Sequence, residues 1–92
     1  FEMAALYDPK MAEAHDSLGT LASRRRDWRT AIKHYRDALA ARPGYDRALL
    51  GIGTALAASG DPLSARSYLQ QAAASSNPDV RNEAMEILEA VR

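Results

Sequence analysis

The sequence has no cysteine, no net charge and no long apolar run, and each absence excludes a class of function. Without cysteine there is no disulfide framework, thiolate zinc site or cysteine nucleophile, and the compartment stays open between cytoplasm and periplasm. Twelve basic side chains balance twelve acidic ones, so no long-range field attracts nucleic acid. No apolar run approaches the roughly 18 to 20 residues that span a bilayer, so neither nucleic acid nor a membrane is expected as a partner.

What is present is the composition of a folded domain with an internal repeat. Hydrophobic residues make up 47% of the 92-residue chain and charged residues 26%, which is typical of a globular protein. Pro9, Pro43 and Pro78 divide the chain at intervals of 34 and 35 residues. Residues 12–45 align with residues 46–79, which predicts two copies of one structural unit.

Each unit has the hydrophobic period of an α-helix. One apolar stripe is expected on Trp28, Ala31, Ile32, Tyr35, Ala38 and Leu39, and an earlier one on Ala14, Leu18, Leu21 and Ala22. Capping signals agree, because Asp27, Asp61 and Asn77 each precede an expected helix. The pattern predicts five helices and a short stub of an earlier one, near residues 12–25, 28–41, 46–58, 62–75 and 78–91, with the stub at 1–7.

A 34-residue unit of helix, turn and helix resembles the tetratricopeptide repeat, whose signature is W-x2-L-G-x2-Y, then A-x3-F, then A and P. The first unit matches at Leu18-Gly19, Ala31, Tyr35, Ala38 and Pro43, although His15 stands where tryptophan is usual. The second unit keeps Gly53, Ala65 and Ala72, with Leu49, Ile52, Leu56 and Leu69 as apolar replacements. The resemblance implies an all-α fold, a right-handed superhelix of antiparallel helix pairs.

The same register divides the chain. Residues 1–11 are expected to end a truncated preceding repeat, 12–45 and 46–79 to be repeats, and 80–92 to form a C-terminal capping helix with a polar outer face. This arrangement suggests the C-terminal part of a longer tetratricopeptide repeat protein. The apolar residues of the first segment would then lack a cover, which predicts self-association through the N-terminal end: Phe1, Ala4, Ala5 and Leu6.

The resemblance also implies how the helices pack. Small residues would let the two helices of a unit approach closely, with Gly19 facing Ala31 and Gly53 facing Ala65. Larger side chains would fill the remaining spaces. The predicted packing residues are Leu18, Gly19, Ala31, Tyr35, Ala38, Ile52, Gly53, Ala65, Leu69 and Ala72.

No pattern predicts catalysis, a cofactor or a metal ion. His15 and Asp16 are adjacent, so on a helix their side chains point about 100° apart. Neither His15 nor His34 lies at ligand spacing from another histidine in the sequence. The segment 51–53 has two glycines but lacks the strand and the further glycines of a phosphate loop.

In the family, the first helices of successive repeats line a concave groove that receives an extended peptide or a helix of a partner. By register, the groove residues here are Glu13, Asp16, Thr20, Ser23, Arg24, Arg47, Leu50, Thr54, Ala57 and Ala58. Chaperone-binding members hold a C-terminal carboxylate with basic residues at two of these positions in successive repeats, but this chain has Asp16, Thr20, Leu50 and Thr54 there. That activity is therefore not implied.

The resemblance implies a non-catalytic scaffold that binds another protein or peptide. Leu50 beside Arg24 and Arg47 would suit an apolar partner segment carrying an acidic residue. Two alternatives stay open. The chain could be a structural spacer or self-association segment, or a regulatory appendage of an enzyme that lies outside this sequence.

Overall fold

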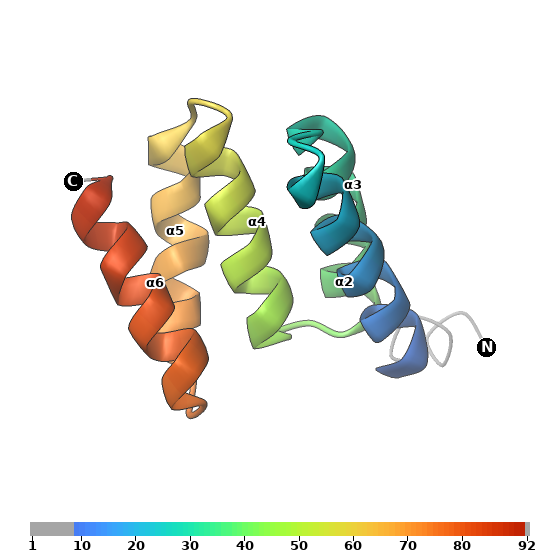
Figure 1. The fold of residues 1–92 in the computed structure, drawn as a ribbon. Coiled ribbons are helices and arrows are strands. Elements are labelled where there is room, and N and C mark those ends of the chain that lie inside the picture. The colour runs from blue at the N-terminus through green and yellow to red at the C-terminus, as the bar shows by residue number, and fades with distance from the viewer. Residues whose placement is uncertain (1–8, 92) are drawn as a thin grey trace.

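The computed structural model describes residues 9–91, which form five α-helices and contain no strand. The all-α fold is confirmed. The helices stand side by side in chain order (Figure 1): α2 (Pro9–Arg24), α3 (Trp28–Ala41), α4 (Asp46–Ala58), α5 (Pro62–Ala73) and α6 (Pro78–Ala90).

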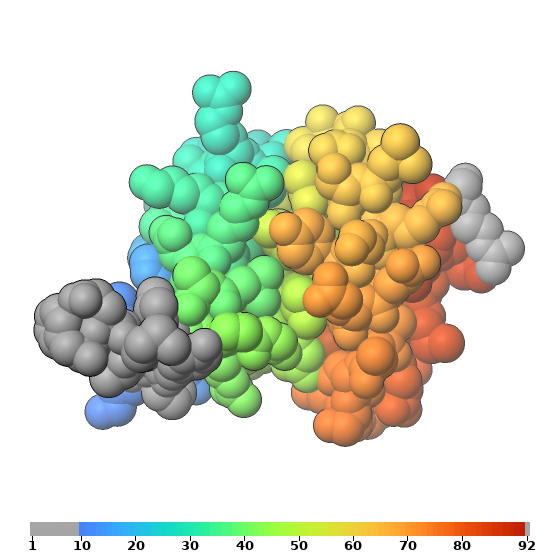
Figure 2. Space-filling view, turned by 180° about the vertical axis from the view of Figure 1, so that it is seen from behind, coloured from blue at the N-terminus to red at the C-terminus, as the bar shows by residue number. Residues whose placement is uncertain are grey.

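The helices form two layers. Helices α2, α4 and α6 lie in the layer nearer the viewer in Figure 1, and α3 and α5 lie behind them. Each helix packs against the next along the chain, and α4 also contacts both α2 and α6. Seen from behind, α3 and α5 cover much of α4 (Figure 2). The first helices of successive repeats therefore share one layer, and their side chains can line one surface.

The turn inside each repeat shows the 34-residue period directly. The backbone N–H of Asp27 donates to the carbonyl of Ala22 at 2.9 Å, and that of Asp61 donates to the carbonyl of Leu56 at the same distance. The carboxylates of Asp27 and Asp61 each accept from the backbone N–H three residues later, at 3.3 Å, and so cap α3 and α5. The two turns are copies of one structure.

Most predicted helix boundaries are correct to within a residue or two. Helix α2 already includes Pro9, the first described residue, and so extends at least three residues further toward the N-terminus than predicted. A proline is tolerated in the first turn of a helix because no hydrogen bond is lost there. Helix α5 ends at Ala73 because the backbone at Ala74, with φ −88° and ψ 1°, leaves the helical path. The predicted stub at 1–7 lies outside the described residues.

The core is built mostly from alanine, with a few large side chains between the helices. Ile52 and Leu69 are the largest fully buried side chains, and Tyr35 is 4% exposed. Close helix packing follows from the many small residues. Nine of the ten predicted packing residues are buried: Gly19, Ala31, Tyr35, Ala38, Ile52, Gly53, Ala65, Leu69 and Ala72.

The prediction for Leu18 is wrong, because its side chain is 44% exposed. Leu21, on the same stripe, is 48% exposed. The face of α2 that packs against α3 and α4 consists of smaller residues, and the leucines point away from it. The buried residues of α2 are Ala12, Asp16, Gly19 and Ala22.

The role predicted for the glycines also needs correction. A Cβ atom on Gly19 would lie 2.7 Å from Cε1 of Tyr35, and one on Gly51 would lie 2.4 Å from Cζ of the same ring. A Cβ on Gly53 would lie 2.7 Å from Cγ of Leu69. The nearest neighbours of these glycines thus belong to one large side chain in each repeat, where an alanine of the facing helix was expected. The ring of Tyr35 lies between α2 and α4.

Candidate peptide-binding groove

The layer formed by α2, α4 and α6 carries a cavity of about 420 Å³. Its volume falls within the usual range for ligand pockets. Three helices and one side chain from α3 contribute to it. The cavity is lined by Asp16, Thr20, Ser23, Tyr35, Arg47, Leu50, Gly51, Thr54, Asn77, Asp79, Val80 and Glu83.

Six of the ten residues predicted for the groove line this cavity: Asp16, Thr20, Ser23, Arg47, Leu50 and Thr54. The other four do not. Glu13, Arg24 and Ala58 are exposed elsewhere, and Ala57 packs against the core. The cavity is therefore centred between α2 and α4, and the N-terminal part of α2 and the last turn of α4 lie outside it.

The contribution of α6 was not predicted, because this helix was expected only to cap the last repeat. Asn77, Asp79, Val80 and Glu83 all line the cavity. Asn77 caps the start of this helix, since its side-chain oxygen accepts from the backbone N–H of Asp79 at 3.0 Å. Extending the rule for first helices to the last helix would have found this wall of the groove.

The wall formed by α2 and α4 has a repeated hydrogen-bond pattern. The hydroxyl of Thr20 donates to the carbonyl of Asp16 at 3.0 Å, and that of Thr54 donates to the carbonyl of Leu50 at 2.8 Å. Thr20 also lies 3.2 Å from the hydroxyl of Tyr35. Tyr35 thereby connects the core to the groove, and the two threonine hydroxyls are already partly engaged.

Asp16 is the buried charged residue of the groove. It is only 6% exposed, and its Oδ2 lies 3.6 Å from Nε of Arg47, whose side chain is 66% exposed. Burial raises the pKa of the Asp16 carboxyl above its ordinary value of 3.8, and the attraction of Arg47 only partly opposes this. The ionised carboxylate is therefore less stable here than in water, although Arg47 lies beside it.

Replacing Asp16 with asparagine is expected to increase the free energy of unfolding at pH 7, because the amide keeps the shape and removes the buried charge. With a raised folded-state pKa, the protonated form favours folding. This contribution to the free energy of unfolding is fully present below pH 3.8, the pKa in the unfolded state. It is lost as the pH rises through the higher pKa that Asp16 has in the folded state. Urea unfolding at several pH values should show the advantage of the variant shrinking on acidification. A constant advantage at every pH would contradict the assignment.

The charges around the cavity are mainly negative. Asp16, Asp79 and Glu83 supply carboxylates, and Arg47 is the one basic residue of the lining. Arg47 already pairs with Asp16. Such a lining would attract a basic group more than an acidic one, so the expectation of an acidic partner residue loses its main support.

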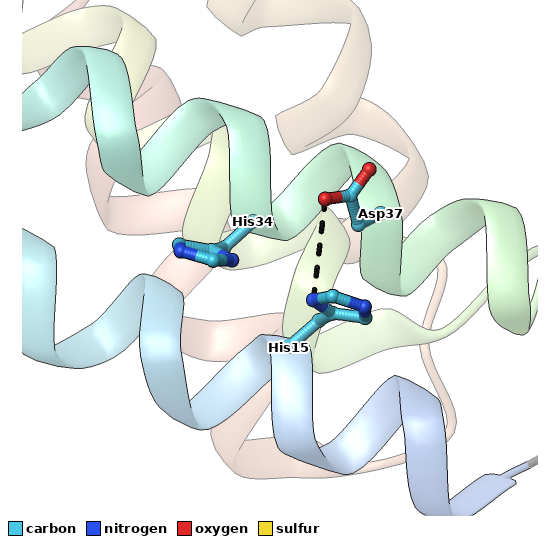
Figure 3. Close-up of side chains that lie close together, drawn as sticks. All are labelled: His15, His34 and Asp37. Atoms are coloured by element: carbon cyan, nitrogen blue, oxygen red, sulfur yellow. Dashed lines mark ion pairs between the residues drawn. The ribbon is translucent and has the colours of Figure 1, made fainter.

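A second group of polar residues comes together on the helix pair α2 and α3, away from the cavity lining. The rings of His15 and His34 stack with centroids 5.8 Å apart and planes inclined by 27°. Nδ1 of His15 lies 4.0 Å from Oδ2 of Asp37 (Figure 3). Sequence spacing alone suggested that the two histidines were unrelated. The spacing of His34 and Asp37, three residues apart on one helix face, was the available signal.

None of the helices between residues 9 and 91 is long and apolar enough to cross a membrane. A family model described as the tetratricopeptide repeat matches residues 17–80, more than half of the chain. No curated protein and no solved structure gives a significant match. The matched segment includes both turns with the 34-residue period and the three glycines that pack against Tyr35 or Leu69. The chain therefore belongs to the tetratricopeptide repeat family.

Proposed function

We propose that this chain is a non-catalytic scaffold that binds a peptide or helix of a partner protein in its groove, with Asp16 receiving a basic side chain. Tetratricopeptide repeats generally mediate protein–protein interactions and typically have no catalytic activity. The observation that carries the proposal is the buried, destabilised carboxylate of Asp16 in the cavity wall. Groups with perturbed ionisation in a cleft are candidates for a functional site.

Arg47 explains how the site could exchange one cation for another. Its side chain is 66% exposed and contacts Asp16 at 3.6 Å, longer than a strong charge-assisted hydrogen bond. Because the side chain of Arg47 is mostly exposed, its guanidinium can move into water when another cation takes its place beside the buried Asp16 carboxylate. A guanidinium of the partner could then make a bidentate contact with Asp16, which Arg47 does not make.

The rest of the lining specifies the neighbouring part of the ligand. Leu50 and Val80 are the large apolar residues of the lining, and Asp79 and Glu83 provide negative charge on the α6 side. Burial of an apolar side chain against such a surface supplies affinity, and the carboxylates supply selectivity. We therefore expect a short segment in which a leucine-like residue lies near arginine or lysine.

The proposal is tested by selecting binders from a displayed library of random linear peptides. Enrichment of basic residues beside apolar ones is expected. The affinity of the protein for the selected peptides is then measured. Leu50→Glu in the protein should weaken binding at least about 30-fold, because it puts a charge on the apolar surface, and Asp16→Asn should weaken it about tenfold. Glu86→Gln, on the exposed face of α6, is the matched control and should change nothing. Acidic consensus peptides, or affinity unaffected by Leu50→Glu, would refute the groove assignment.

A second candidate function is self-association, which the exposed side chains of α2 favour. Met11, Leu18 and Leu21 are 46%, 44% and 48% exposed. The residues first expected to carry this role, at 1–6, lie outside the described residues. A regulatory appendage of an enzyme could use either this surface or the groove.

Self-association through α2 predicts a concentration-dependent rise in mass by sedimentation equilibrium. Leu18→Glu and Leu21→Glu should each restore the monomer, because a charge on the contact surface opposes burial. Leu63→Glu is a control, since Leu63 is 79% exposed on α5. A monomer at high protein concentration would reject this candidate.

A further inference from the structure

We propose that His15, His34 and Asp37 bind a divalent transition-metal ion of the zinc type between α2 and α3. This site is separate from the groove, because none of its three residues lines the cavity. His15 projects from α2, and His34 and Asp37 project from α3 toward it (Figure 3). The proposal does not depend on the proposed function.

The potential ligand atoms of the three residues lie almost close enough together to bind one ion. One potential ligand atom of each residue lies within 4.8 Å of the others, and His15 Nδ1 is 4.0 Å from Asp37 Oδ2. Around tetrahedral zinc, with ligand bonds of about 2.0 to 2.1 Å, neighbouring ligand atoms are about 3.3 Å apart. Side-chain movements of about 1 Å would therefore bring the three groups into contact with one ion.

Two ring nitrogens provide an independent reason to expect a ligand. Nδ1 of His15 and Nδ1 of His34 are both shielded from solvent, and neither has a hydrogen-bond partner. The 4.0 Å separation between His15 Nδ1 and Asp37 is too long for a hydrogen bond. Buried polar atoms in folded proteins are nearly always satisfied, and a metal ion at this position would satisfy one or both nitrogens.

The donor set determines the class of ion. Two imidazoles and one carboxylate without a thiolate suit zinc and its neighbours in the first transition row, and do not suit calcium or magnesium, which prefer oxygen ligands. The side chains of His15 and Asp37 are 27% and 45% exposed, so solvent reaches the site and water can complete the coordination. Because the ligands come from two helices, the ion would hold α2 against α3 in the first repeat.

Isothermal titration of the chain with zinc chloride in a non-chelating buffer tests the site. Saturable binding of one ion per chain is expected. His15→Gln, His34→Gln and Asp37→Asn should each weaken binding at least about tenfold, whereas Glu86→Gln should not. Cobalt in place of zinc should give visible absorption bands typical of four or five ligands, which His34→Gln abolishes.

A thermal melt provides the second readout. An ion that binds only the folded chain should raise the melting temperature by about 10 °C at a hundredfold excess over the dissociation constant. Circular dichroism without metal establishes that each variant folds. Binding that is unchanged in both histidine variants, or one ion shared by two chains, would overturn the proposal. Absence of saturable binding by the folded chain would overturn it as well.

Discussion

Tyr35→Ala is expected to lower the free energy of unfolding by about 3 to 5 kcal/mol, the usual cost of removing a buried aromatic ring. The side chain is 4% exposed, and its ring lies where Cβ atoms on Gly19 or Gly51 would collide with it. Two of the residues that contact the ring, Gly19 and Gly51, have no side chain that could extend into the space it leaves. A domain of this size has a total stability of only about 5 to 15 kcal/mol, so the loss is a large part of it.

Urea unfolding followed by circular dichroism measures this loss. Tyr35→Phe is the matched control, because it keeps the ring and removes only the contact of the hydroxyl with Thr20, at a cost of about 1 kcal/mol. An effect of Tyr35→Ala no larger than that of Tyr35→Phe would contradict the packing role.

The contact between Gly19 and the ring of Tyr35 provides a second test of this packing. Gly19→Leu in the native sequence is expected to cost about 1 to 3 kcal/mol, because its side chain would collide with the ring of Tyr35. In the Tyr35→Ala background the same substitution should cost much less, since the ring is gone and the leucine fills part of the cavity. A double-mutant cycle measures this coupling. Strict additivity, or a melt unchanged by Gly19→Leu alone, would argue against this register of α2, α3 and α4.

Leu69→Ala is expected to destabilise the second repeat by about 2 to 5 kcal/mol. Leu69 is fully buried and occupies the position that corresponds to Tyr35, with Gly53 making room for it. Truncation removes the side chain and leaves a cavity between α4 and α5, because Gly53 on the facing helix has no side chain that could fill it.

The control for this substitution lies on the same helix. Leu63 is 79% exposed, so Leu63→Ala removes the same atoms with almost no loss of burial and should change stability by less than about 0.5 kcal/mol. Chemical denaturation of both variants gives the comparison. Equal effects at the two leucines would mean that Leu69 does not sit in the core.

Several features of the fold followed from short-range patterns. The limits of α3 and α4 were predicted correctly because caps, turns and hydrophobic period act within a few residues. The outward direction of Leu18 and Leu21 was not predicted. The sequence shows two possible stripes on α2, one large and apolar and one composed mainly of small residues, and only the helices packed against it select between them.

Only part of the candidate groove could be predicted from the sequence. Repeat register identified Asp16, Thr20 and Leu50, because equivalent positions on equivalent helices share a surface. It did not reveal that Asp16 is buried and paired with Arg47, since burial depends on how closely α2 and α4 approach. It also left out the wall formed by α6.

The sequence by itself determined the repeat, the helices and the residues that cap them, because these depend on contacts between near neighbours in the chain. Only the tertiary structure decided which face of α2 is buried, which side chain each glycine admits, and that His15 meets His34 and Asp37. The physical reason is register. The vertical offset and rotation of one helix against another result from the packing of whole surfaces, and no short stretch of sequence contains that information.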